Sequence, residues 1–328
     1  MNRFFFCVSG LLLLGLVSLW GEANFETNRA TNLWVPQTLQ AGQVSAVVVW
    51  GGALSSDFRV SILNDKGKAL YTVHSFLLPE TYNTAAGVQG LQAALLAVDA
   101  LTPTQHAYLK LEDKQGVTYE YALTILAGHF PREILHLNRA MSHLREKPSV
   151  VVHQQAISIW DIYLATHSQA VYQDQSWSMP LQGNPPISSP FGDTRTFVYT
   201  DGSQSSTYHS GIDFAVVQGT PVKACGAGKV VLSQMRKLTG ETVVIEHLPG
   251  VYSDYFHLSK RLVEEGALVQ QGQLIGYSGA TGLVTGPHLH WEIRVHGVPV
   301  NGENLVERHV LDKSWILAKI ADAVRKRG

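Results

Sequence analysis

The sequence predicts a mostly β protein in which two β domains are joined by a partly helical linker. Short runs rich in Val, Ile, Thr, Tyr and Phe recur through residues 33–126, with turn residues between them. Residues 127–180 contain helical periodicity and few turns. Glycines again separate β-branched runs over residues 181–308. A chain of 328 residues is long enough for both domains.

Residues 33–126 are expected to form an immunoglobulin-like β-sandwich. The turn Asn64–Gly67 separates two strand-like runs and indicates a hairpin. Alternate residues from Val117 to Ile125 are apolar, so one face of that strand should be buried. Turns at this spacing are typical of a sandwich. Such a domain could bind glycan, dock a partner or cover an active site, and the sequence leaves these three roles open.

Two segments show the periodicity of helices. Within the linker, residues 154–166 place Ala156, Trp160 and Tyr163 at helical spacing, which predicts a helix. Residues 309–328 are expected to form a C-terminal helix, because their apolar residues share one side and their last turn is basic. We expect this helix to pack on the protein rather than to lie on a membrane surface.

Residues 1–23 have the pattern of a secretory signal peptide. Arg3 precedes an apolar run over residues 4–20, and Gly21–Ala23 supplies the small residues of a cleavage site. The alternative is an uncleaved segment that tethers the protein to a membrane, although residues 4–20 are slightly short for a span. Either case predicts an exported protein.

Composition excludes several classes of function. The net charge of −1 and the lack of a basic cluster argue against a nucleic-acid partner. One of the 2 cysteines, Cys7, lies in the signal segment, so the mature chain cannot form an intramolecular disulfide. The other, Cys225, alternates with strand-like neighbours and is expected to be a small buried residue.

A strand-like run near the C-terminal end carries two histidines. His288, His290, Glu292 and Arg294 are alternate residues and therefore share one face of the strand. The other face is apolar and suits the core, so the histidine face should look into solvent or a groove. Two histidines at this spacing occur often by chance, and the pair alone identifies no site.

A second pattern places His209 four residues before Asp213. In an extended strand these residues would be roughly 13 Å apart, so Gly211 is expected to allow a bend that brings them together. A third histidine, His257, is expected to share a strand face with Tyr255. Catalytic zinc is commonly held by three His and carboxylate ligands and keeps one position for water. Geometry leaves open whether both His288 and His290 would bind the metal.

Several ordered motifs cover residues 186–301. They are ISSPFGDTR (187–195), HSGIDFAV (209–216), GTPVKACGAGKVV (219–231), VVIEH (243–247), YFHLS (255–259), GALVQQGQLIGYSGATG (266–282) and GPHLHWEIRV (286–295). In sequence and order they resemble the motifs of the lysostaphin/LytM-type zinc metallopeptidases, which cut peptide bonds in bacterial peptidoglycan.

The resemblance implies a role for each residue of the two patterns. His209, Asp213 and His290 would bind one catalytic Zn²⁺, whereas His257 and His288 would be catalytic without binding it. The implied activity is hydrolysis of peptide cross-links in peptidoglycan by zinc-activated water. The domain, residues 181–308, would be an antiparallel β-sheet with a groove for the peptide stems. Such an enzyme would be periplasmic or associated with the cell envelope.

The alternative is a non-catalytic protein of the same fold that binds the cell wall or activates other cell-wall hydrolases. The intact residues of the motifs favour the enzyme. Glu292 as general base is disfavoured, because the family does not place its base there. The pattern HxHxDH of a metallo-β-lactamase is absent after His288. The general base, His257 or His288, and the bond cleaved, a D-Ala–diamino-acid cross-link or a glycine-containing bridge, stay open.

Overall fold

A computed structural model describes residues 25–28, 32–52, 54, 57–86, 88–137, 150–165, 169–307 and 313–325. The expected signal peptide, residues 1–23, lies outside these residues, and so does the possible tether at residues 4–20. The fold is mostly β, as expected, with 46% strand and 12% helix. Among the described residues, no helix is both long and apolar enough to span a membrane.

The N-terminal unit contains two five-stranded sheets and a short helix. One sheet has the order β1 (Phe25–Asn28), β2 (Leu33–Pro36), β4 (Val44–Val49), β8 (Gln92–Ala97) and β7 (Phe76–Leu77). The other has the order β3 (Thr38–Gln40), β10 (Thr118–Leu126), β9 (Gln105–Glu112), β5 (Arg59–Asn64) and β6 (Ala69–His74), and the helix is α1 (Glu80–Ala86).

The predicted hairpin of this unit is confirmed, and the predicted buried strand face is confirmed only toward its C-terminal end. Strands β5 and β6 form the expected hairpin, and Asn64 Oδ1 accepts hydrogen bonds from the backbone N–H groups of Lys66 and Lys68 in its turn. In β10, Leu123 and Ile125 are buried while the alternating residues are more exposed. The immunoglobulin-like topology itself stays a prediction.

The C-terminal unit is built on an eight-stranded antiparallel sheet. Its order is β12 (Ile187–Ser189), β15 (Ile212–Phe214), β23 (Leu289–Val295), β19 (Val251–Leu258), β18 (Gly240–Leu248), β17 (Gly228–Arg236) and β21 (Leu268–Val269), with β24 (Val298–Val300) also paired to β23. Two three-stranded sheets complete it, namely β16 (Pro221–Lys223), β22 (Leu274–Tyr277) and β20 (Lys260–Arg261), and β11 (Arg132–His136), β13 (Thr194–Val198) and β14 (Gln204–Tyr208).

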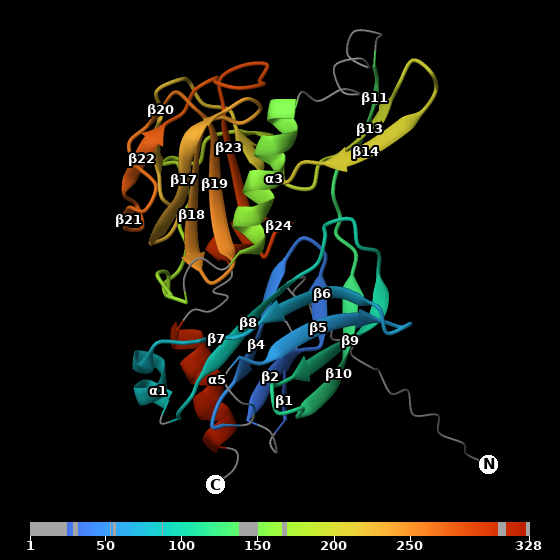
Figure 1. Ribbon diagram of the computed structural model, residues 1–328, viewed down its shortest axis with the longest axis vertical. Coiled ribbons are helices and arrows are strands. Elements are labelled where there is room, and N and C mark those ends of the chain that lie inside the picture. Colours follow the sequence, from blue (N-terminus) through green and yellow to red (C-terminus); the bar gives the residue numbers. More distant parts are fainter. Residues whose placement is uncertain are drawn as a thin grey trace, which may run out of the picture.

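The linker does more than connect the two units. Its strand β11, which the sequence did not indicate, pairs in parallel with β13. Its helix α3 (Val150–Leu164) lies against the main sheet of the C-terminal unit (Figure 1). Ile159 and Tyr163 are its buried residues, whereas Trp160 is 46% exposed. Of the residues whose spacing predicted the helix, Tyr163 is therefore buried and Trp160 lies largely at the surface.

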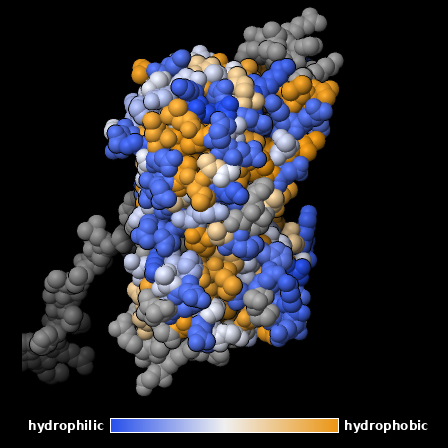
Figure 2. All heavy atoms as spheres, turned by 60° about the vertical axis from the view of Figure 1, so that its left-hand side comes forward, coloured by the Kyte–Doolittle hydropathy of each residue, from blue (hydrophilic) through white to orange (hydrophobic). Residues whose placement is uncertain are grey.

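The two units share one apolar core. A single cluster of buried residues contains Val47 and Leu95 of the N-terminal sheets as well as Trp291 of β23. The helix α5 (Lys313–Arg325), which follows α4 (Gly302–Glu307), lies beside α1 in the N-terminal unit (Figure 1). It packs as expected, with Ile316 and Ile320 fully buried. From the side shown in Figure 2, the two units form one continuous body.

Candidate metal centre

Two neighbouring strands bring the C-terminal motifs together. In the antiparallel pair of β15 and β23, Asp213 lies directly opposite His290. His209 follows the end of β14, and the chain bends over residues 209–211 before β15 begins. The expected bend is therefore present, but Gly211 is needed for another reason than the bend. A Cβ there would lie 2.5 Å from the backbone oxygen of Trp291, so only glycine lets β15 approach β23 so closely.

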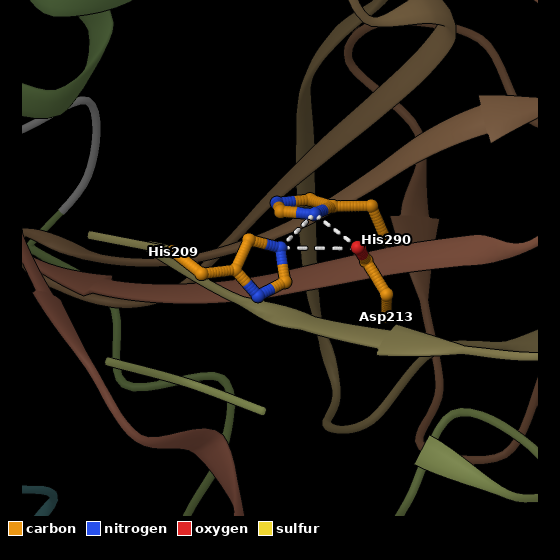
Figure 3. A group of neighbouring side chains, drawn as sticks. All are labelled: His209, Asp213 and His290. Carbon is orange, nitrogen blue, oxygen red and sulfur yellow. Dashed lines mark hydrogen bonds and ion pairs between the residues drawn. The ribbon is translucent and has the colours of Figure 1, made fainter. Parts of the chain in front are cut away.

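Three side-chain atoms of these residues converge on one point (Figure 3). His209 Nε2 lies 3.0 Å from His290 Nδ1 and 3.2 Å from Asp213 Oδ1, and the last two atoms are 2.7 Å apart. Ligands about 2.0–2.1 Å from a tetrahedral zinc ion are separated by about 3.3 Å. Two imidazole nitrogens and one carboxylate oxygen in such a triangle fit one face of a zinc site.

The outer nitrogens of both imidazoles are held by oxygen atoms. His209 Nδ1 lies 3.1 Å from the carbonyl oxygen of Pro190, and His290 Nε2 lies 2.8 Å from Glu292 Oε1. Since these oxygens accept hydrogen bonds, each outer nitrogen carries a proton, and the inner nitrogen is the atom that can bind a metal ion once any proton on it is displaced. This arrangement is typical of histidines that bind metal ions.

The charges of the triangle are strongly coupled. Burial opposes ionisation of Asp213, but hydrogen bonds with His209 and His290 hold its pKa far below the usual range. Burial also disfavours a charged His290, yet its hydrogen bonds to Asp213 and Glu292 raise its pKa to about 9. A divalent cation would take the place of the proton between His290 and Asp213, so its binding should release protons.

His257 and His288 form a second pair beside the triangle. Their ring centroids are 4.8 Å apart, and His288 Nε2 lies 3.8 Å from Asp213 Oδ1. Nδ1 of His257 donates to the carbonyl oxygen of Thr281 at 2.8 Å, and Nδ1 of His288 donates to that of Gly286 at 2.9 Å. In its neutral form, each ring that donates through Nδ1 presents Nε2 without a proton. Burial lowers the pKa of His257 to about 4, so this ring is neutral near pH 7.

The loop before β23 supplies those carbonyl groups. Gly282 has φ of +83°, in the left-handed region that favours glycine, and a Cβ there would lie 2.4 Å from the carbonyl oxygen of Leu238. A Cβ on Gly279 would lie 2.4 Å from the backbone nitrogen of Ser259. These glycines let the loop pack closely enough to direct the carbonyl of Thr281 at His257.

Comparison with known proteins places this arrangement in a family. Residues 207–302 match the model of peptidase family M23. The chain carries an M23 peptidase domain. The resemblance seen in the sequence motifs is thereby confirmed.

Curated relatives match part of the chain at high identity. Peptidoglycan DD-endopeptidase ShyA of Vibrio cholerae is 52% identical over 93 residues, which are 28% of this chain and 22% of that protein. DD-carboxypeptidase/endopeptidase Mpg of Neisseria meningitidis is 44% identical over 117 residues, 35% of this chain and 26% of that protein. The chain thus spans about a quarter of the length of these relatives.

One solved structure resembles most of the chain. A crystal structure from Pseudomonas aeruginosa described as a peptidase M23 aligns with a TM-score of 0.56 and 24% identity, covering 81% of this chain and 93% of that chain. This likeness shows that the fold extends well beyond the M23 domain.

Two predictions about side-chain direction in the M23 domain are wrong. His257 does not share a face with Tyr255, because His257 has φ of +59° and the pairing of β18 with β19 shifts register nearby. Its ring lies instead on the side of Phe256, which stacks on His290 with centroids 5.2 Å apart. The histidine face of β23 is also not open along its length, since His290 and Glu292 are buried.

The support behind His290 in the M23 domain was not evident from the sequence. Glu292 is 4% exposed and accepts hydrogen bonds from Ser210 and Arg294 as well as His290. It therefore supports a ring of the triangle from behind and does not face the open side. The shared face of His290, Glu292 and Arg294 was visible in the sequence, but the helix that covers it was not.

Proposed function

We propose that this protein is an exported zinc endopeptidase that hydrolyses peptide cross-links of bacterial peptidoglycan. The observation that carries the proposal is the triangle of His209 Nε2, Asp213 Oδ1 and His290 Nδ1, with two further histidine nitrogens beside it. The M23 domain supports the class of reaction, and the curated relatives support the substrate.

A zinc ion held by the three ligands would lower the pKa of a water molecule to about 7 and polarise the scissile carbonyl. The side chains at the site would transfer protons, orient the substrate and stabilise the oxyanion. In their neutral forms, His288 and His257 each offer Nε2 as a base that can accept a proton from the attacking water and return it to the leaving amine. The ring that does not carry the proton can orient the substrate or stabilise the oxyanion.

The relatives also favour one type of bond. ShyA is named a peptidoglycan DD-endopeptidase, and Mpg a DD-carboxypeptidase/endopeptidase. We therefore favour the cross-link between D-Ala and the diamino acid over a glycine-containing bridge. An exported protein would meet either type of peptidoglycan cross-link in the periplasm or at the cell envelope.

The proposal is tested by digestion of purified peptidoglycan with residues 24–328, with and without a chelator. We expect fragments whose masses correspond to cleaved cross-links, and we expect the chelator to stop their release and added zinc to restore it. A folded, zinc-loaded protein that releases no fragments would contradict the proposal and favour the non-catalytic alternative. In that case, stimulation of a separate cell-wall hydrolase by the inactive protein would identify an activator.

A further inference from the structure

We propose that the linker helix α3 positions the metal ligand His290 through Arg294 and Glu292. This inference rests on the proposed function, because it takes His290 as a ligand. Helix α3 spans Val150–Leu164 and lies outside the residues that match the family. Its role would therefore add to the site a part that the M23 domain does not contain.

A carboxylate supports the ring of His290 from behind. Glu292 Oε1 lies 2.8 Å from His290 Nε2, and Glu292 Oε2 lies 2.6 Å from Nη2 of Arg294. A metal-bound histidine is oriented and made more basic by a carboxylate at its outer nitrogen. A movement of Glu292 would therefore change the orientation of the His290 ring, and Glu292 is held by Ser210 through Oε1 and by Arg294 through Oε2.

Helix α3 holds Arg294 in place. The guanidinium carbon lies 4.6 Å from the centre of the Tyr163 ring and 5.5 Å from that of Trp160, and both residues belong to α3. The arginine side chain is only 12% exposed, so these contacts act in a largely dry environment, where cation–π attraction is strongest. Arg294 thus lies between the helix and Glu292.

Helix α3 is also fixed to the same sheet by a buried hydrogen bond. The hydroxyl of Tyr163 donates to Oδ2 of Asp254 at 2.6 Å, and the same oxygen lies 3.6 Å from Nε of Arg294. Asp254 is fully buried in β19, next to β23. Tyr163 therefore fixes the helix and Arg294 through one carboxylate, so that a shift of α3 must displace Arg294.

The test measures zinc affinity by competition with a chelator, on the full chain and without peptidoglycan. Trp160→Leu removes one ring over Arg294, and Tyr163→Phe removes the hydrogen bond to Asp254 while keeping the other ring. We expect each variant to raise the dissociation constant of zinc about tenfold, the lower range for lost outer partners of a ligand. The visible spectrum of the cobalt-substituted protein should shift with it, because the angle of His290 changes.

Tyr252→Phe is the matched control. The hydroxyl of Tyr252 donates to the carbonyl oxygen of Ala165, just beyond the end of α3, and its ring contacts that of Tyr163. The variant removes the hydrogen bonds of this hydroxyl to Ala165 and Glu246, but it keeps the ring contacts of Arg294 and the hydrogen bond from Tyr163 to Asp254. It should lower thermal stability but leave the affinity for zinc and the cobalt spectrum unchanged.

A double-mutant comparison distinguishes a positioning role of α3 from a general effect on stability. In a Glu292→Gln background, where the path is already weakened, Trp160→Leu should have little further effect on zinc affinity. The inference is overturned if Trp160→Leu and Tyr163→Phe bind zinc as the wild type does, or if their effects persist in full beside Glu292→Gln. Wild-type protein that binds no zinc would contradict the proposed function instead, so the two failures are distinguishable.

Discussion

The hydroxyl of Tyr208, the residue directly before His209, donates a hydrogen bond to Asp99 Oδ2 of the N-terminal unit at 2.8 Å. The ring of Tyr208 also packs against Phe191, with centroids 6.2 Å apart, and Phe191 packs in turn against Phe130. The strand that leads into the triangle is thus held from the N-terminal unit. That unit contributes to the geometry of the site whatever else it binds.

Tyr208→Phe should weaken both folding and metal binding, because it removes this contact while keeping the ring. We expect the free energy of unfolding to fall by about 1.5–3 kcal/mol, the range for a hydrogen bond to a charged group, and zinc to bind less tightly. Denaturant unfolding and chelator competition measure the two effects. Tyr199→Phe is the control, since its hydroxyl forms a hydrogen bond with Ser205 within the same hairpin. Equal zinc affinity in both variants would contradict the prediction.

The ligand and non-ligand histidines should differ in metal content. His209→Ala and Asp213→Ala each remove one corner of the triangle and should purify without zinc. His257→Ala leaves all three ligand atoms in place, so it should retain zinc and lose turnover of peptidoglycan. Metal analysis of each folded variant, beside its activity, checks the assignment. A folded His257→Ala protein without zinc would make His257 a ligand and require a different triangle.

Gly211→Ala should separate β15 from β23. The new Cβ would lie 2.5 Å from the carbonyl oxygen of Trp291, 2.7 Å from Cγ of Glu292 and 2.8 Å from Nε2 of His290. Overpacking of this kind costs about 1–3 kcal/mol, and here it also moves one ligand-bearing strand. Gly286→Ala is the matched control, because a Cβ there meets no atom within 4 Å. Thermal unfolding and zinc content should drop in the first variant only.

Asp254→Asn should change how stability depends on pH. Burial and the nearby charge of Glu292 raise the pKa of Asp254 from 3.8 to about 7, while Arg294 and the hydrogen bond from Tyr163 act in the opposite direction. Below pH 3.8 both the folded and the unfolded chain hold this proton; above it the unfolded chain releases the proton first. The contribution of Asp254 to stability is therefore present at low pH and lost as the pH rises through about 7.

The measurement is the difference in free energy of unfolding between Asp254→Asn and wild type over that range. The variant should gain stability relative to wild type as the pH rises, because an amide has no proton to lose. A difference that does not vary with pH would show that Asp254 titrates alike in the folded and unfolded chains.

The confirmed sequence predictions rest on the alternation of apolar and polar residues and on the order of the motifs. These patterns predicted the mostly β fold, the hairpin at Asn64–Gly67 and the peptidase family, because each depends on residues close together in the chain or on a long ordered match. The approach of His209, Asp213 and His290 also followed, since the resemblance supplied what strand geometry left open.

The remaining features depend on contacts that local patterns do not record. A regular strand cannot describe His257, because a register shift and a positive φ turn its ring to the other side. The burial of Glu292 requires knowing that α3 covers β23, and no spacing in the sequence specifies this packing. The parallel pairing of β11 with β13 joins residues about sixty positions apart, and a short strand of five residues has little signal of its own.

The backbone of His257 also bears on attempts to engineer the protein. An L-residue with φ of +59° costs roughly 1–2 kcal/mol compared with ordinary backbone, and the hydrogen bonds of its N–H to Thr239 and of its ring to Thr281 offset part of that cost. A library screened only for heat resistance would thus favour residues that tolerate this conformation, such as glycine or asparagine, over the histidine proposed to move protons. Selection for thermal stability and selection for catalytic turnover would therefore favour different residues at position 257.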